Sequence, residues 1–145
     1  MATPNDCIFC AIVAGKAPAH RVHEDDRVLI FMDLFPVAEG HTLIIPKRHG
    51  ATLFETEVED LKAAIAHSKP LAEAIQREFA PAGIGVYQLN GAAAGQTVFH
   101  YHMHLIPRNQ GDGLGIHGRR QEEAQVLANH AARLSKAFES AAGKR

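Results

Sequence analysis

The sequence carries almost no excess of charge of either sign. Fifteen lysines and arginines stand against sixteen aspartates and glutamates, so the net charge at pH 7 is −1 with histidine neutral. Proteins that bind long nucleic acids through phosphate contacts usually carry a basic excess, so this composition argues against such a partner. A small nucleotide ligand is still compatible with it, because a confined site needs only a few local hydrogen-bond donors.

Long apolar runs, a leader segment and a set of disulfide-forming cysteines are also missing. No run approaches the about 18 apolar residues that a membrane-spanning helix needs. The stretch 1–6 lacks the basic and apolar regions of a secretory signal peptide. The two cysteines, Cys7 and Cys10, lie too close together to staple distant parts of a fold. We therefore expect a cytoplasmic protein without a membrane partner.

The length and composition are those of one globular domain. A chain of 145 residues buries roughly two-thirds of its unfolded surface on folding, which is enough for a core. Apolar residues make up 46% of the chain and charged residues 21%, which is ordinary for a globular protein. We expect a single domain over residues 1–145 with a C-terminal helical extension at about 119–140.

Three histidines at every second position dominate the sequence. His100, His102 and His104 alternate with aromatic and aliphatic residues, and this period of two predicts a strand over 98–108. Alternate residues of a strand point to the same face, so one face would carry three imidazoles and the other would be apolar. Imidazolium ions that close repel one another, so at least one ring should be neutral near pH 7.

Neutral imidazoles can serve several purposes. The rings could form a solvated strand face, or two or three of them could bind a metal ion. They could also act as a nucleophile and as acid–base groups. Their common register, directly after the small-residue loop 90–96, favours a functional site over a solvated face.

The histidine motif, followed by two apolar residues, resembles the active-site motif of the histidine triad (HIT) family of nucleotidyl hydrolases and transferases. The loop Asn90–Thr97 is similar to that family's phosphate-side loop, and the Phe-Met-Asp segment ending at Asp33 and the run Gly40–His49 also match. The resemblance covers roughly residues 7–108, most of the chain. It implies a hydrolase that binds a nucleotide and cleaves a nucleoside phosphoramidate or dinucleoside polyphosphate at the α-phosphate.

The resemblance also implies a role for each histidine of the motif. His102 would be the nucleophile and form a covalent nucleotidyl–histidine intermediate. A neutral imidazole suits this task, because it is not repelled by the negative phosphate and forms a labile P–N bond. His100 would orient His102, and His104 would hold a phosphate oxygen or pass a proton to the leaving group.

The resemblance assigns nucleotide-binding residues as well. Asp33 would accept hydrogen bonds from the ribose hydroxyls, although an aspartate before Pro36 could equally form an Asx turn. The loop 90–96 could approach an anion with its backbone N–H groups or could simply connect two strands. The donors to the α-phosphate would be Gln96 and Thr97, with Asn90 nearby. The apolar walls of the base pocket would be Ile8, Phe9 and Phe31.

The Cys-x-x-Cys pair has three interpretations: half of a zinc site, a redox motif or coincidence. Gly15 and Pro18 argue against the long helix that a redox motif requires. By the resemblance, Cys7 and Cys10 would hold Zn²⁺ with His49 and His100 in a closed tetrahedral site. The alternative function is therefore a zinc-dependent nucleotide-binding module, regulatory or structural, without turnover.

The remaining elements complete an α+β fold. Strands are predicted at 21–23, 28–32, 42–45 and 84–89 beside the histidine strand, and helices at 58–79 and 122–138, with a short helix or turn at 7–15. Pro70 predicts a kink or break in the long helix. We expect an antiparallel sheet of about five strands, with the long helix on its non-histidine face and a C-terminal helix. By the resemblance, the long helix and the sheet edge at 85–89 would form a homodimer.

Overall fold

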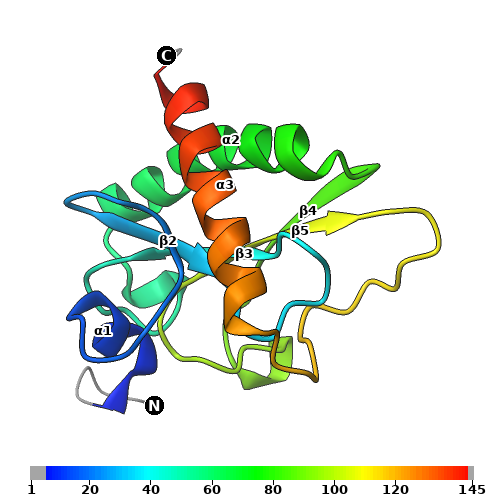
Figure 1. Cartoon of the computed structure of the whole chain (residues 1–145). Helices are drawn as coiled ribbons and strands as arrows, with labels where there is room; N and C mark the ends of the chain where they lie inside the picture. Colours follow the sequence, from blue (N-terminus) through cyan, green and yellow to red (C-terminus); the bar gives the residue numbers. More distant parts are fainter. Residues whose placement is uncertain (1–5, 144–145) are drawn as a thin grey trace.

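The computed structural model describes residues 6–143 and contains one antiparallel sheet with two long helices (Figure 1). The strands follow the order β1-β2-β3-β5-β4, which confirms the predicted α+β fold with a five-stranded sheet. In chain order the helices and strands are α1 (Ile8–Val13), β1 (Arg21–Glu24), β2 (Val28–Met32), β3 (Thr42–Pro46), α2 (Val58–Phe79), β4 (Gly83–Gln88), β5 (Met103–Arg108) and α3 (Ala124–Ala142). Short 3-10 turns lie at Leu53–Glu55 and Ala92–Ala94.

The two faces of the sheet bury different clusters. Ile30 and Ile44 pack with Leu71 of α2 and Leu134 of α3 on one face. The opposite face packs against α1, and β5 presents His104 to it, directly opposite Leu43 of β3. As predicted, α2 therefore covers the non-histidine face. The C-terminal helix packs on the same side, against α2, β1 and β2.

Pro70 lies inside α2, which runs unbroken from Val58 to Phe79, so of the predicted kink or break the break does not occur. Proline removes one backbone hydrogen bond and crowds the preceding turn, at a cost of about 3 kcal/mol. Leu71 and Ile75, directly after the proline, are fully buried. Each contributes about 2–3 kcal/mol by its burial, so packing of the second half of the helix outweighs the cost of the proline.

The histidine strand is shorter than predicted, because β5 begins only at Met103. His100 and His102 precede it and are not strand residues. If the pairing of β3 with β5 continued, Pro46 would face Tyr101, and proline has no N–H to donate to a ladder. The N–H of Tyr101 instead donates to the carbonyl of Gly50 at 2.7 Å. Both faces of β5 are buried, so its histidine face is not solvated.

The strand β4 occupies one edge of the sheet, and its Val86 is 50% exposed. This edge is the one that the sequence assigned to a dimer contact, and the homodimer remains a prediction. None of the helices within residues 6–143 has the length and apolar character needed to cross a membrane.

Candidate active site

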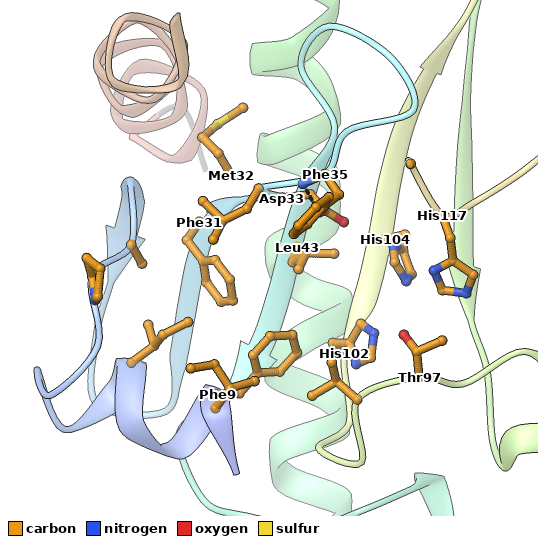
Figure 2. Close-up of a pocket in the computed structure, with 17 residues that line it drawn as sticks. Phe9, Phe31, Met32, Asp33, Phe35, Leu43, Thr97, His102, His104 and His117 are labelled. Carbon is orange, nitrogen blue, oxygen red and sulfur yellow. Dashed lines mark hydrogen bonds between the residues drawn. The ribbon is translucent and has the colours of Figure 1, made fainter. Parts of the chain in front are cut away.

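A cavity of about 400 Å³ opens on the α1 side of the sheet (Figure 2). It lies between α1, the ends of β2 and β3, the segment before β5 and the loop that carries His117. Of the predicted site residues, seven line this cavity: Ile8, Phe9, Phe31, Asp33, Thr97, His102 and His104.

One end of the cavity is apolar and the other is polar. Phe9 and Phe31 form the apolar end, with their rings in edge-to-face contact at a centroid distance of 5.4 Å. Figure 2 shows His102, His104 and His117 together with Thr97 at the opposite end. An elongated ligand with an aromatic group at one end and an anionic group at the other fits this division.

His102 is held in one tautomer by its own backbone neighbour. Its Nδ1 lies 2.7 Å from the carbonyl oxygen of His100, and since a carbonyl only accepts, Nδ1 carries the proton. The lone pair is therefore on Nε2. Burial lowers the pKa of His102, which keeps the ring neutral at neutral pH. Phe9 meets the ring edge-to-face at 5.1 Å and helps to fix its orientation.

The tautomer of His104 is fixed by a second histidine, His41, which directly precedes β3. The backbone N–H of Val37 donates to Nδ1 of His41 at 3.1 Å, so Nε2 of His41 carries the proton. That Nε2–H points to Nδ1 of His104 at 2.9 Å. His104 must therefore carry its own proton on Nε2. Burial lowers the pKa of both rings to about 3, so both are neutral at neutral pH.

The proton on His104 Nε2 is an unused donor. This atom is buried and has no hydrogen-bond partner among the described residues. Buried polar atoms are nearly always paired, so an unpaired one beside a cavity marks a position that a ligand can fill. The His104 and His102 rings lie 4.9 Å apart, so an electron-pair donor and a hydrogen-bond donor stand side by side. This pair suits attack on a phosphorus atom together with a hydrogen bond to its leaving group.

Asp33 forms the Asx turn that its sequence allowed, and it also borders the cavity. Its Oδ1 accepts the N–H of Phe35 at 2.8 Å, which is the Asx turn. Its Oδ2 lies 3.3 Å from Nε2 of His41, and the side chain borders the cavity. Burial raises the pKa of Asp33 to about 6, while the hydrogen bond from Phe35 acts in the opposite direction. Because the pKa of His41 is far below neutral, this contact is a polar one and not an ion pair.

Two of the predicted phosphate ligands lie outside the cavity wall. Gln96 is buried, and its Nε2 donates to the carbonyls of Ala51 and Val98, at 2.6 and 3.0 Å. Its Oε1 accepts the N–H of Gly91. Asn90 exchanges side-chain hydrogen bonds with Gln88 and accepts the N–H of Leu53 through Oδ1. Both side chains thus hold the loop 90–97 in place, and Thr97 alone of the three borders the cavity.

The four predicted metal ligands converge next to the histidine motif. Sγ of Cys7 lies 3.4 Å from Nδ1 of His100, and Sγ of Cys10 lies 3.3 Å from Nδ1 of His49. All four ligand atoms lie within 4.8 Å of one another. The sequence separated these residues by up to 93 positions, so the fold alone brings them together.

The chemistry of these four groups fits a tetrahedral metal ion. Nε2 of His100 donates to the carbonyl of Pro46 at 2.7 Å, which leaves Nδ1 as a free electron pair facing the sulfurs. Burial lowers the pKa of His100 to about 4 and so keeps that pair available. Burial, together with the neighbouring Cys7, raises the pKa of Cys10 to about 11. Without a cation the Cys10 thiol stays protonated, whereas a bound ion such as Zn²⁺ stabilises thiolates.

The sequence motif did not identify two histidines of this site. His41 belongs to the matched run Gly40–His49, but nothing in the sequence showed that it reaches His104 across the sheet. His117 follows a glycine-rich stretch, lines the cavity, and donates from Nε2 to the carbonyl of Gly95 at 2.7 Å. No local pattern marks it, because only the path of the loop after β5 brings it within 6.0 Å of the His104 ring.

Comparisons with known proteins agree with this geometry. The HIT domain family model matches residues 14–111. "Protein hit" of Bacillus subtilis is 48% identical over 112 residues, which are 76% of this chain and 77% of that protein. The adenylylsulfatase HINT3 of Arabidopsis thaliana is 37% identical over 132 residues, 91% of this chain and 64% of that protein.

A solved structure shares the whole architecture. A Zn-bound histidine triad family protein from Mycobacterium smegmatis superimposes with a TM-score of 0.84 and 34% identity, covering 99% of this chain and 100% of that chain. The family model spans most of the chain and includes all three histidines of the motif. The chain therefore belongs to the HIT family.

Proposed function

We propose that the protein binds a nucleotide and hydrolyses its bond at the α-phosphate through a covalent nucleotidyl–histidine intermediate. The substrates are of the nucleoside phosphoramidate or dinucleoside polyphosphate class. The observation that carries the proposal is the pairing of His102, neutral with its lone pair on Nε2, with the unpartnered Nε2–H of His104. The Arabidopsis relative named adenylylsulfatase HINT3 supports a hydrolase acting on an adenylyl compound.

In the first step, Nε2 of His102 forms a bond to the α-phosphorus while the bond from phosphorus to the leaving group breaks. The leaving group departs with the electron pair of the broken bond. The Nε2–H of His104 donates a hydrogen bond to it, while Nδ1 of His104 accepts the Nε2–H of His41. A leaving group that needs a proton takes it from solvent. As positive charge develops on His102, the carbonyl of His100 accepts its Nδ1–H. Water then attacks the phosphorus and releases a proton to solvent, and the P–N bond breaks with its electron pair returning to Nε2 of His102.

The rest of the nucleotide follows the polarity of the cavity. The base binds at the apolar end of the cavity beside Phe9 and Phe31, and the ribose hydroxyls donate hydrogen bonds to the Asp33 carboxylate. Thr97 donates its hydroxyl to an α-phosphate oxygen, a contact of a kind worth about 3–4 kcal/mol when made in the transition state. Asn90 and Gln96 contribute by holding the loop on which Thr97 sits.

A zinc ion held by Cys7, Cys10, His49 and His100 would stabilise the fold beside this site. Its four protein ligands would leave no open position for a water molecule. His100 would connect the two sites, because its ring faces the sulfurs and its carbonyl orients His102. The similarity to the Zn-bound M. smegmatis protein supports this assignment.

A single experiment tests the activity. The purified protein is incubated with adenosine phosphoramidate or a diadenosine polyphosphate, and released AMP is measured. Rapid quenching should trap a phosphoramidate adduct that is labile in acid and maps to His102. The rival function, a zinc-dependent nucleotide-binding module without turnover, is favoured by the converging Cys/His cluster. It predicts nucleotide binding with no AMP release and no adduct.

A further inference from the structure

A second histidine cluster lies on the opposite, helical side of the sheet, away from the nucleotide cavity. His23 belongs to β1, Asp25 to the turn between β1 and β2, and His67 to α2. The rings of His23 and His67 both contact Phe138 of α3, at centroid distances of 4.5 and 6.1 Å. Their side chains remain 24% and 22% exposed, so the cluster is half-buried and open to solvent.

The three side chains aim their ligand atoms at one point. Nε2 of His23 lies 2.9 Å, and Nε2 of His67 lies 2.7 Å, from the same Oδ2 of Asp25. The three atoms lie within 4.8 Å of one another. The other oxygen of Asp25 accepts the N–H groups of Arg27 and Val28, at 2.9 and 3.0 Å, which fixes the carboxylate with Oδ2 toward the rings.

The hydrogen bonds of His67 expose a conflict. Its Nδ1 lies 2.6 Å from the carbonyl of Ala63, one helical turn back, and a carbonyl can only accept, so Nδ1 carries a proton. In the neutral ring, Nε2 is then a lone pair pointing at a carboxylate oxygen. Two electron-pair donors at 2.7 Å repel unless a cation lies with them. That cation is either a second proton on the ring or a metal ion.

We propose that His23, Asp25 and His67 form a binding site for a divalent transition-metal ion such as Zn²⁺ or Co²⁺, separate from the cysteine cluster. Two imidazoles with one carboxylate are a ligand set that such ions favour. Ligand atoms around one such ion lie about 3–4 Å apart, so on binding the half-buried Asp25 carboxylate would move slightly away from the two ring nitrogens, which now lie 2.9 and 2.7 Å from it.

The groups around these three side chains match those around metal ligands elsewhere. A metal-binding histidine typically donates its other N–H to a backbone carbonyl, as His67 does to Ala63. A ligating carboxylate is itself held by hydrogen bonds, as Asp25 is by two backbone N–H groups. Three protein ligands leave at least one position for water. The ion would tie the β1–β2 turn to α2, and it would stabilise the fold without taking part in hydrolysis.

The probe is Co²⁺ added to the full chain and followed by its absorption spectrum. Cobalt bound by cysteines gives an intense thiolate charge-transfer band, whereas cobalt bound by nitrogen and oxygen ligands gives only weak d–d bands. We expect weak d–d bands from a cobalt ion that has no thiolate ligand. They should appear whether or not a second, thiolate-bound cobalt ion is also present. This result is independent of the proposed hydrolase function.

The matched variants are His23→Phe and His67→Phe, which keep the ring against Phe138 but remove the nitrogen ligand. Each should weaken the thiolate-free Co²⁺ site at least about tenfold, whereas His20→Gln, a change outside the cluster, should not. Asp25→Asn gives a third variant that keeps the side-chain shape if a phenylalanine variant fails to fold. Cobalt bound only with the thiolate band, or thiolate-free cobalt bound equally by all variants, overturns the proposal.

Discussion

The triad cluster (His41, His100, His102 and His104) and the turn cluster (His23, Asp25 and His67) use the same side chain in opposite ways. The triad residues are at least 93% buried. Backbone carbonyls or another ring accept the protons of His41, His100 and His102, whereas the Nε2–H of His104 has no partner among the described residues. In the turn cluster the rings are half-exposed, and both face a carboxylate. Neutral acceptors and burial produce neutral rings with defined lone pairs, whereas a carboxylate calls for a proton or a metal ion.

The two aspartates show the same contrast. Burial raises the pKa of Asp33 to about 6, and the hydrogen bond from Phe35 together with the neighbouring His117 offsets this only in part. Burial also raises the pKa of Asp25, but hydrogen bonds from His23, His67 and two backbone N–H groups outweigh it and hold that pKa well below its ordinary value. The protein's own groups therefore stabilise the charge of Asp25, whereas the charge of Asp33, which borders the cavity, is stabilised less.

The largest expected effect is on His102, whose replacement by alanine should lower turnover by about a thousandfold or more. Nucleotide binding should change little, because the ring contributes an electron pair to the chemistry and only part of one cavity wall. AMP release and nucleotide affinity are measured side by side, with His67→Phe as the control from the turn cluster. Turnover at the wild-type rate, or an adduct on another residue, contradicts the mechanism.

The substitution His41→Phe should lower kcat by about ten- to hundredfold with little change in KM. The His41 ring does not line the cavity, but its Nε2–H fixes the tautomer of His104, and without it His104 can place its proton on Nδ1. The same substitution at His67 in the turn cluster should leave both constants unchanged. Equal effects of the two substitutions would mean that only general stability had been disturbed.

Replacement of Asp33 by alanine should weaken ribonucleotides about tenfold or more and dideoxy analogues far less. The carboxylate contributes to the binding affinity only when ribose hydroxyls donate hydrogen bonds to it. The affinity lost on its removal therefore depends on whether the sugar carries those hydroxyls. Binding of both nucleotide classes is measured by calorimetry, with Asp25→Ala as the matched aspartate control. If Asp33→Ala weakens both classes equally, Asp33 supports the loop and not the ribose.

The smallest effect concerns acid stability. The pKa values of His41 and His104 are about 3 in the fold, below an unfolded value of 6.5, so the unfolded chain binds more protons in this interval. Stability should therefore fall as pH drops below 6.5, by roughly 1 kcal/mol per pH unit for each ring. Asp33 has the opposite effect on stability between pH 3.8, its unfolded pKa, and about pH 6, its folded pKa. Folding raises this pKa, so here the folded chain binds the additional proton.

Urea unfolding at about pH 7 and about pH 5 measures this slope, and His41→Phe should reduce it by the share of one ring. A wild-type stability that is unchanged over this interval would show that the triad rings are not held neutral.

Much of the site was visible in the sequence because its residues are close together along the chain. The alternation of His100, His102 and His104, the small-residue loop before it and Asp33 after an apolar strand predicted the family and the buried sheet. The same pattern predicted too long a strand, since it cannot show that Pro46 ends the pairing with β3. The prediction of a break at Pro70 failed because local cost was visible and the packing of Leu71 and Ile75 was not.

The sequence by itself determined the kinds of group present, their period and the order of the elements, because these depend on neighbours along the chain. Only the tertiary structure decided which nitrogen of each ring holds its proton, because that depends on carbonyls and rings from other elements. Val37 fixes the tautomer of His41, which in turn fixes that of His104, and the carbonyl of Pro46 fixes the tautomer of His100. The turn cluster is the extreme case. His67 reaches the Asp25 carboxylate that faces His23 only when α2 packs on the sheet, which no local pattern records.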